Sequence, residues 1–380
     1  MKKTRCLFVI LLMFTAFAVN GNAAFAKADP QQVIVKFKEE NQTAIGAADT
    51  SAVSRKGQTA MTALEVPAGK TAEAFMDELK ERGNVEFVEP DYRIELAYTP
   101  NDPDFSGLQY HHQRIETAPA WDQTRGSADV VVAVIDDGMD VAHPELAKQF
   151  IAPYDALTKQ AGTISPSLHG THVAGLIAGS ADNGIWGTGV APHTKILPID
   201  VFDDEGYAYT SDLIHGIEHA MAANVDIINM SLGSYNYSKA MDQAIQKAHK
   251  QGIVIVAAAG NDGTRNAHYP SSLANVISVG AVTSNDTSSL FSNKGPTIDV
   301  TAPGTDVYSS LPGNLFGPLS GTSMAAPIVS GVAALIKADQ PSLSNKEIED
   351  RIFSSADDLG KIGRDDVYGN GRVNAKKALE

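Results

Sequence analysis

Residues 130–138 read Val-Val-Val-Ala-Val-Ile-Asp-Asp-Gly, a run of six apolar residues that ends in two carboxylates and a glycine. β-Branched residues dominate the run, and continuous apolar runs of this length are typical of parallel strands covered on both faces. Further strand-like runs follow at 195–202, 226–232, 253–258, 276–281 and 298–302. Helix-like segments separate them, at 171–179, 211–223, 239–250 and 323–338. The alternation predicts an α/β domain with a parallel sheet and helices on both of its faces.

Ligands of such sheets bind beyond the carboxyl ends of the strands, so the residues that follow each strand are informative. Four chemically capable side chains stand there or at helix starts, each beside small residues: Asp136, His169, Asn261 and Ser323. A serine hydroxyl is a weak nucleophile and needs a base, which His169 could supply. An adjacent carboxylate, Asp136, would favour the imidazolium that forms. The Asn261 amide and the Ser323 backbone N–H, at a helix start, would supply donors to an oxyanion.

Each of these residues also has an ordinary structural explanation when it is taken alone. An Asp after a strand is commonly a turn former, and a Ser before a helix is commonly a cap. Their joint fit to one acyl-transfer mechanism favours catalysis over coincidence. His172 could pair with His169 on zinc, but no Glu stands between them and no cysteine is nearby, so we expect His172 to be a packed helix residue. We expect Pro327 to lie in the first turn of its helix, where N–H groups bond no carbonyl.

Residues 1–26 have the layout of a secretory signal. Basic residues precede an apolar run at 7–19, and Ala24-Phe25-Ala26 places small residues at both recognition positions of a cleavage site. The run is short for a membrane span, although an uncleaved anchor is the alternative interpretation. The chain has one cysteine, Cys6, which leaves with this segment. We therefore expect a secreted protein with no disulfide and no membrane anchor after cleavage.

The next segment, 27–97, has the pattern of a small α+β domain. Strand-like runs at 33–37, 63–66, 85–88 and 92–96 surround one helical pattern at 72–82. Roughly 70 residues with this little apolar content would be marginally stable alone. We expect the domain to need a partner surface, and the rest of the chain provides one.

Composition excludes several classes of protein for this 380-residue chain. Hydrophobic residues make up 43% and charged residues 20%, which is ordinary for a globular protein and not for a coiled coil or a disordered chain. The formal net charge is −15, and nearly all of the acidic excess follows residue 96. A chain this acidic is a poor candidate for binding nucleic acid, which is held largely by counterion release.

Three blocks of sequence resemble the signatures of subtilisin-like serine proteases. They are Asp136-Asp137-Gly138, His169-Gly170-Thr171-His172 and Gly321-Thr322-Ser323-Met324-Ala325, and they stand in the order Asp, His, Ser that is known for subtilisin. The likeness begins at Tyr98-Thr99-Pro100-Asn101-Asp102-Pro103, which looks like the start of thermitase-type members, and residues 27–97 look like the family's inhibitory propeptide. The resemblance implies the subtilisin-like form of the α/β fold, with a parallel sheet of the seven-stranded type, in a catalytic domain at 98–380.

The resemblance also implies a function. Asp136, His169 and Ser323 would form the catalytic triad and Asn261 the oxyanion hole of a secreted serine endopeptidase. The protein would be a monomer made as a zymogen that processes itself, with the propeptide as intramolecular inhibitor and folding template. Its other partners would be protein or peptide substrates. In the family, a peptide lies extended between two strand segments, which match Ser231-Leu232-Gly233 and Gly206-Tyr207-Ala208.

Two further sets of residues follow from the same resemblance. Ala258 and Gly260 would wall the pocket for the side chain that precedes the cut bond, and His268 stands at its base, where many relatives have a small residue. Calcium is the implied cofactor, and oxygen-only ligands suit this hard cation. The matching residues are Asp102, Glu145, Ala181, Asn183, Ile185 and Gly187.

Two rival functions remain at this point. A catalytically inactive, peptide-binding relative would keep the cleft but not the chemistry. An esterase of the α/β-hydrolase type would also use a serine, but its Gly-x-Ser-x-Gly motif and its Ser–Asp–His order do not match this chain.

Overall fold

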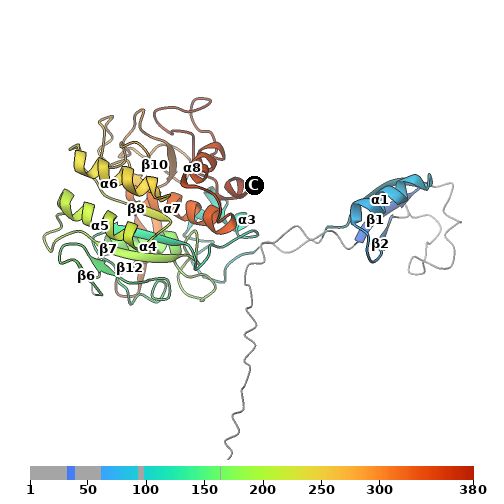
Figure 1. Cartoon of the computed structure of the whole chain (residues 1–380), viewed down its shortest axis with the longest axis horizontal. Coiled ribbons are helices and arrows are strands. Elements are labelled where there is room, and N and C mark those ends of the chain that lie inside the picture. The colour runs from blue at the N-terminus through green and yellow to red at the C-terminus, as the bar shows by residue number, and fades with distance from the viewer. Residues whose placement is uncertain (1–31, 39–60, 93–97, 163) are drawn as a thin grey trace, which may run out of the picture. The chain divides into compact units, whose positions relative to one another are not determined.

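A computed structural model describes residues 32–38, 61–92, 98–162 and 164–380 (Figure 1). The chain divides into two compact units, with the division between residues 96 and 97. The expected signal segment 1–26 lies outside the described residues, as does residue 97, at which the expected propeptide ends. So does most of the strand expected at 92–96.

The small unit is an antiparallel sheet with one helix. Strands β1 (Gln32–Phe37), β2 (Met61–Glu65) and β3 (Val85–Pro90) pair in the order β2-β1-β3. The helix α1 (Ala72–Glu81) begins after Thr71, whose hydroxyl accepts the Ala74 N–H at 3.2 Å. Val33 and Val35 of β1 share a small apolar core with Phe75 and Leu79 of α1. The predicted α+β character of this unit is confirmed.

The large unit is built on one sheet with the strand order β11-β10-β9-β8-β4-β7-β5-β6. Seven of these strands pair in parallel, and only the short β6 at the edge is antiparallel. The predicted parallel sheet is therefore confirmed, with the short strands β5 and β6 as additions. The strands are β4 (Val131–Asp136), β5 (Tyr154–Asp155), β6 (Gln160–Ala161), β7 (Lys195–Asp200), β8 (Ile227–Met230), β9 (Val254–Ala258), β10 (Ile277–Val282) and β11 (Val300–Pro303).

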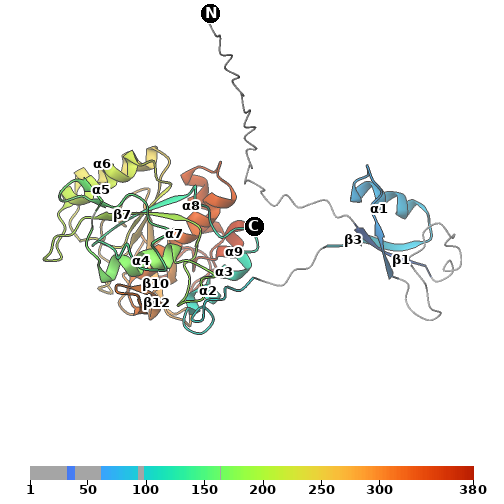
Figure 2. The ribbon, with the colours of Figure 1, turned by 90° about the horizontal axis from the view of Figure 1, so that it is seen from below.

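Helices cover both faces of this sheet, as Figure 2 shows. Along β4, Val132 and Val134 belong to the core that contains α4 (Leu168–Ala178) and α7 (Thr322–Asp339). Ala133 and Ile135 point the other way, into the core shared with α5 (Thr210–Ala222) and α6 (Lys239–Lys250). Both sets of side chains are fully buried, which explains why the strand has no polar alternation. Within the described ranges, no helix has the length and apolarity needed to cross a membrane.

Several smaller elements were not predicted from the sequence. They complete the surface around the sheet, and the hairpin β12–β13 packs its first strand on α4. The helix α8 begins with a capping box between Ser344 and Glu347, a signal that the sequence does contain. The added elements are α2 (Tyr110–Arg114), α3 (Thr117–Ala120), β12 (Val307–Leu311), β13 (Leu315–Leu319), α8 (Asn345–Ser354) and α9 (Ala375–Leu379).

The expectation for Pro327 was wrong. The helix α7 begins at Thr322, so Pro327 is its sixth residue and lies beyond the first turn. A proline has no N–H, so the Ser323 carbonyl four residues earlier receives no helical hydrogen bond from it. The Ser231 hydroxyl donates to that carbonyl instead, at 2.9 Å. The proline therefore allows a contact between the start of α7 and the segment after β8.

Three histidines are buried beneath α4 and the β12–β13 hairpin. His172 contacts the Val307 carbonyl at 2.9 Å through Nε2, and His112 contacts the Thr188 carbonyl at 3.1 Å through its own Nε2. Neither ring nitrogen of His111 has a partner within the described residues. Burial lowers the pKa of His112 and of His172 to about 4, and that of His111 well below its ordinary value. His172 is a packed helix residue, and among the described side chains it joins no metal-binding group of three.

These histidines predict a stability that falls in acid. Their pKa values are lower in the folded than in the unfolded chain, so the unfolded chain binds more protons between about pH 6.5 and 4. The stability that these neutral histidines contribute is fully present above pH 6.5 and is lost as the pH falls toward 4. We expect the thermal midpoint of a Ser323→Ala form to drop over this range, and His111→Leu to reduce the drop without destabilising the protein at pH 7. Equal pH slopes for the two forms would contradict this account.

Candidate active site

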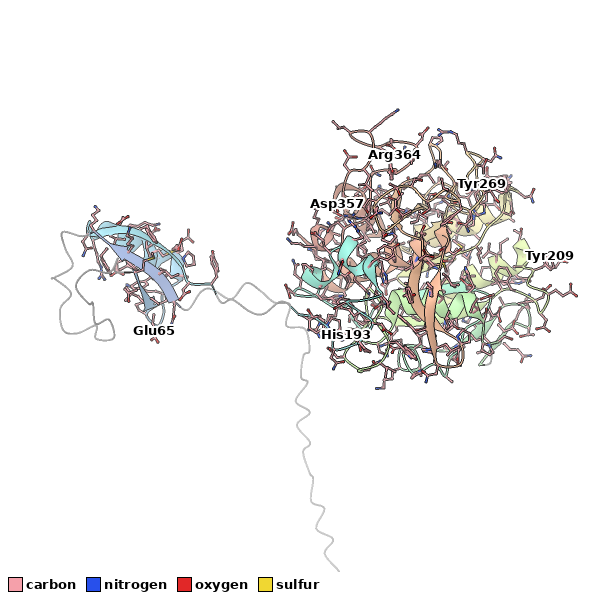
Figure 3. All side chains as sticks on the ribbon, turned by 180° about the vertical axis from the view of Figure 1, so that it is seen from behind. Glu65, His193, Tyr209, Tyr269, Asp357 and Arg364 are labelled. Carbon is pink, nitrogen blue, oxygen red and sulfur yellow. The ribbon has the colours of Figure 1, made fainter. Side chains whose placement is uncertain are left out.

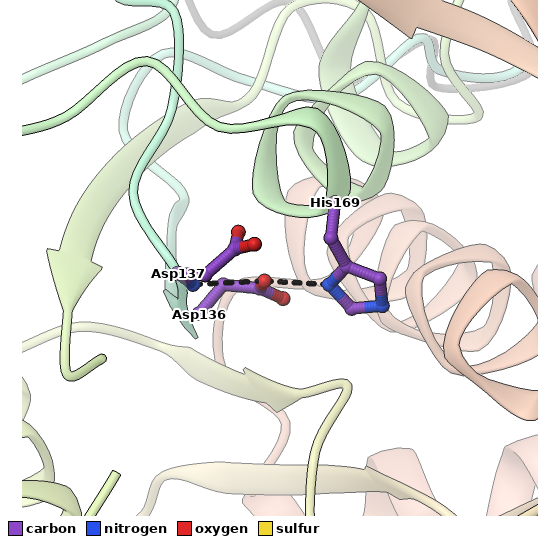
Figure 4. A group of neighbouring side chains, drawn as sticks. All are labelled: Asp136, Asp137 and His169. Atoms are coloured by element: carbon purple, nitrogen blue, oxygen red, sulfur yellow. Dashed lines mark hydrogen bonds and ion pairs between the residues drawn. The ribbon is translucent and has the colours of Figure 1, made fainter. Parts of the chain in front are cut away.

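Asp136 and His169 meet at the carboxyl edge of the sheet. Asp136 is the last residue of β4, and His169 lies in the first turn of α4. The Asp136 Oδ1 atom lies 2.6 Å from His169 Nδ1, as the dashed line in Figure 4 marks. The Asp137 N–H donates to the same carboxylate oxygen at 2.9 Å. The carboxylate therefore holds the imidazole by Nδ1 and leaves Nε2 for other partners.

The pairing depends on a very close approach of α4 to the loop after β4. A Cβ atom on Gly170 would lie only 2.1 Å from the Gly138 carbonyl oxygen, so any side chain at this position would push the helix away. The Gly170 N–H also donates to Asp137 Oδ1 at 2.9 Å, which uses one of the free amides at the helix start. The glycine after His169 thus fixes the imidazole against Asp136.

Electrostatics favour a charged imidazole in this arrangement. Burial acts to lower the pKa of His169, but the attraction and hydrogen bond of Asp136, together with the charge of Asp137, raise it to about 9. One carboxylate oxygen of Asp136, one of Asp137 and one ring nitrogen of His169 all lie within 4.8 Å of one another. Burial raises the pKa of Asp136, and the neighbouring His169 opposes that rise. The Asp136 side chain is 2% exposed and that of His169 33%, so only the imidazole faces solvent.

Ser323 is the second residue of α7, and its carbonyl and hydroxyl both contact Ser231. The Ser323 hydroxyl donates to the Ser231 carbonyl at 3.1 Å, and the Ser231 hydroxyl donates to the Ser323 carbonyl at 2.9 Å. Within the described part of the chain, no hydrogen bond joins Ser323 to His169. The structure therefore joins Asp136 to His169 directly and joins Ser323 to the segment after β8.

Asn261 is oriented by the start of α7. Its Oδ1 accepts both the N–H and the hydroxyl of Thr322, at 2.8 and 2.9 Å. This leaves Nδ2 without a hydrogen bond among the described residues. A Cβ atom on Gly321 would lie 3.5 Å from Asn261 Nδ2 and 3.5 Å from the Ser323 backbone nitrogen. The two donor nitrogens therefore lie on either side of the position that a side chain at residue 321 would take, and glycine leaves this position empty.

The two segments expected to hold a peptide lie in loops rather than in strands. The strand β8 ends at Met230, immediately before Ser231-Leu232-Gly233. Gly206 and Tyr207 belong to a turn, in which the Gly206 N–H donates to Asp203 and the Asp203 N–H donates to Tyr207. Ala208 continues this exposed loop. The expectation of two strand segments was wrong in this respect.

A pocket that was not predicted lies between these two loops. Its volume is about 110 Å³, and most of its lining is apolar or aromatic. Figure 3 shows two of its tyrosines, Tyr209 and Tyr269, on the same flank of the large unit. In the sequence, Leu213 and Met241 of this lining could not be told from ordinary core residues. The lining consists of Phe202, Ala208, Tyr209, Thr210, Leu213, Leu232, Gly233, Ser234, Met241 and Tyr269.

The side chains expected to bind calcium are gathered in one place. Asp102 accepts the backbone N–H groups of Asp182, Asn183 and Gly184, at 2.9, 3.1 and 3.2 Å. The Asn183 side chain donates to Glu145 Oε2 at 3.0 Å. The other oxygen of Glu145 is buried and has no partner among the described residues. Burial, with a contribution from Asp102, raises the pKa of Glu145 to about 8 although Asn183 opposes the shift.

The backbone around Asn183 supplies further oxygens. The carbonyls of Ala181, Ile185 and Gly187 accept no hydrogen bond from the described residues. Trp186 has a φ of 47°, in the left-handed region that favours glycine. Its ring stacks on Phe316 at 6.0 Å between centroids. The Asn183 Oδ1 atom accepts the Ile185 N–H at 3.0 Å, which folds the loop around this residue. The expected ligands are thus carboxylate, amide and carbonyl oxygens, the donor type that calcium prefers.

Comparison with protein families assigns both parts of the chain. Residues 127–371 match the subtilase family model. The chain belongs to the subtilase family. Residues 17–91 match the fervidolysin N-terminal prodomain model. The resemblance to a subtilisin-like serine protease with a propeptide is thereby confirmed, and the chain is a hydrolase of this family.

Relatives agree with this assignment. The chain is 37% identical over 353 residues to a thermophilic serine proteinase of Bacillus sp. (strain AK1), with 92% of this chain and 87% of the relative covered. It is 38% identical over 283 residues to thermitase of Thermoactinomyces vulgaris, with 74% of this chain and all of the relative covered. A solved protease structure from Pseudoalteromonas arctica PAMC 21717 matches with a TM-score of 0.68 and 32% identity, covering 74% of this chain and 99% of that one.

The proximity of Asp137 to His169 predicts a measurable pKa effect in this subtilase. Asp137→Asn keeps an oxygen for the Gly170 N–H but removes the negative charge that favours the imidazolium. We expect the pKa of His169 to fall from about 9 by about one unit, as measured by NMR titration in a Ser323→Ala background. Asp129→Asn, at an exposed site away from the imidazole, makes the same charge change and should leave this pKa unchanged. An unchanged or higher pKa in Asp137→Asn would show that the charge does not act on His169.

Proposed function

We propose that this subtilase is a secreted serine endopeptidase in which Asp136, His169 and Ser323 form the catalytic triad. The observation that carries the proposal is the 2.6 Å contact between buried Asp136 and His169 Nδ1. It fixes the tautomer of the neutral imidazole, with the lone pair on Nε2 that a general base needs. Because the pKa of His169 is about 9, this neutral form is well populated in alkaline solution, where we expect activity to be highest. Ser323 attacks a peptide carbonyl after its side chain turns from the Ser231 carbonyl, and His169 takes the hydroxyl proton. The proton then passes to the leaving amine, and water deacylates the enzyme.

Asn261 and the Ser323 N–H form the oxyanion hole in this proposal. Both donors lie beside the position that Gly321 leaves empty, and the Ser323 amide lies at the positive end of α7. Thr322 orients Asn261 through its Oδ1, so the amide needs no rearrangement when negative charge develops on the substrate oxygen. Preorganised donors of this kind stabilise the transition state more than the ground state.

The small unit is proposed to act as an intramolecular inhibitor and folding template. Its few buried apolar residues make it marginal alone, which favours a role on the surface of the larger unit. Self-cleavage near residues 96–98 would release the mature enzyme as a monomer without a membrane anchor. The substrates are proteins or peptides, held by residues 231–233 and 206–208.

Labelling with a fluorophosphonate tests this function directly. Mass spectrometry of the secreted protein should show one adduct on Ser323 and a new N-terminus near residue 98. Ser323→Ala should carry no adduct and should stay at full precursor length when no other protease is present. An unlabelled wild type would favour the inactive, peptide-binding alternative. A labelled protein that hydrolyses simple esters but no protein would favour the esterase alternative.

Loss of the Asn261 amide should reduce turnover and leave the fold intact. We expect Asn261→Ala to lower kcat by about 10²–10³, a magnitude known from such a substitution in subtilisin itself. KM and the thermal midpoint should change little, because the donor acts on charge that develops only in the transition state. A change in kcat below about threefold would mean that the amide does not face the oxyanion.

We propose calcium as a structural cofactor held by Asp102, Glu145, Asn183 and the carbonyls of Ala181, Ile185 and Gly187. The free buried oxygen of Glu145 and the three free carbonyls support this assignment. A calcium ion supplies the positive charge that two buried carboxylates otherwise lack. Asp102 meanwhile orders the loop by accepting three consecutive backbone N–H groups.

Chelation should therefore destabilise the protein. At calcium concentrations near 100 times Kd, we expect a thermal midpoint about 5–10 °C above that measured with a chelator, in a Ser323→Ala form that cannot digest itself. Glu145→Gln should abolish most of this calcium-dependent increment. Glu205→Gln, in an exposed turn, should retain it. An increment equal in the wild type and Glu145→Gln would place the ion elsewhere.

A further inference from the structure

The space between two wall segments of the candidate cleft is filled by one side chain. Gly233 follows β8 and Gly260 follows β9, and neither has a side chain of its own. A Cβ atom on Gly233 would lie 2.4 Å from Cε1 of His268, and one on Gly260 would lie 3.1 Å from Cγ and Cδ2 of the same ring. The Gly233 Cβ would equally meet the Tyr269 carbonyl at 2.4 Å, and the Gly260 Cβ would meet Asn293 Nδ2 first, at 2.3 Å. The His268 imidazole is the side chain that lies close to both positions.

The imidazole is held in this place by its surroundings. His268 is 9% exposed, and its ring forms a hydrogen bond with the Ala258 carbonyl. The Tyr235 ring packs edge-on against it, at 5.2 Å between centroids and 73° between planes. Nδ1 is buried and has no partner among the described residues. Burial lowers the pKa of His268, with the negative charge of Asp262 opposing the shift, so the ring is neutral at pH 7.

Tyr235 also ties the two walls together. Its hydroxyl donates to Asp262 Oδ2 at 2.5 Å, and it accepts from Asn293 Nδ2 at 3.1 Å. Asn293 is fixed to the second wall, because its side chain donates to the Ala259 carbonyl and its backbone N–H donates to the Gly260 carbonyl. The Tyr235 side chain, from the segment after β8, is thus linked through Asn293 to the segment after β9. We call this connection between Tyr235, Asp262 and Asn293 the strap.

We propose that His268 and the strap restrict the pocket for the substrate side chain preceding the cut bond to small residues such as Gly, Ala and Ser. The inference rests on the proposed function, because it concerns the peptide that Ser323 would cleave. A large apolar side chain would have to displace a buried ring that is packed on both walls. Closed apolar pockets discriminate by about 10–200-fold per additional methylene group, so the preference should be steep.

The test is a series of chromogenic peptides that differ only in the residue before the cut bond, with Ala, Leu or Phe at that position. We expect the wild type to show a kcat/KM for Ala at least about tenfold above that for Phe. His268→Ala should raise the ratio of kcat/KM for Phe to that for Ala at least about tenfold. His193→Ala, at an exposed site, is the matched control and should keep the wild-type ratio.

Tyr235→Phe distinguishes the contribution of the strap from that of the His268 ring. It removes the hydrogen bonds of the Tyr235 hydroxyl and keeps the aromatic packing. We expect a smaller rise in kcat/KM for Phe, of about threefold, because the strap holds the ring in place. A wild type that cleaves Phe peptides as fast as Ala peptides would overturn the inference, whether or not His268→Ala folds. An unchanged Ala-to-Phe ratio in a folded His268→Ala would do the same. Absence of any peptide cleavage, together with absence of fluorophosphonate labelling on Ser323, would instead overturn the proposed function.

Discussion

The contact between the start of α4 and the loop after β4 is the constraint on which the candidate site depends. Gly170 allows the helix to approach so closely that a single methyl group would meet the Gly138 carbonyl at 2.1 Å. At this distance, Asp137 receives the helix amide and Asp136 receives the His169 imidazole. Sheet and helix are held by large apolar cores on both faces, so the contact is part of a rigid framework. The buried carboxylate and the imidazole are positioned before any substrate arrives.

The start of α7 provides the second half of the arrangement. Gly321 leaves space, Thr322 orients Asn261, and Ser323 places both its hydroxyl and its amide at the helix end. Pro327 leaves the Ser323 carbonyl free, and the Ser231 hydroxyl fills that place. The two reciprocal hydrogen bonds between Ser231 and Ser323 therefore link the proposed nucleophile to the segment proposed to bind substrate. Displacement of either serine would disturb chemistry and peptide binding together.

Much of this fold could be predicted because its central strands are mostly apolar. A run such as residues 130–135 has one physical interpretation in a chain of this composition, and helix α6 was predicted with the bounds that the structure shows. The contacts that complete the site could not be predicted in this way. Pro327 suggested a first helical turn, yet the use of its missing N–H depends on Ser231, 96 positions earlier in the chain. His268 was placed at a pocket base by resemblance, but its packing on both Gly233 and Gly260 follows only from tertiary structure.

The surroundings of the buried carboxylates support placing the proposed calcium ion at Glu145 rather than beside Asp136. Asp136, Asp137 and His169 lie close enough to share an ion, but the imidazole already compensates Asp136. Asp200, whose pKa burial raises to about 6, is stabilised by backbone N–H groups of the chain. Glu145 receives a single donor from Asn183, and its second oxygen is buried without a partner in the described structure. The proposed calcium ion would lie beside this oxygen, and its charge would favour the ionised carboxylate, whose pKa burial otherwise raises to about 8.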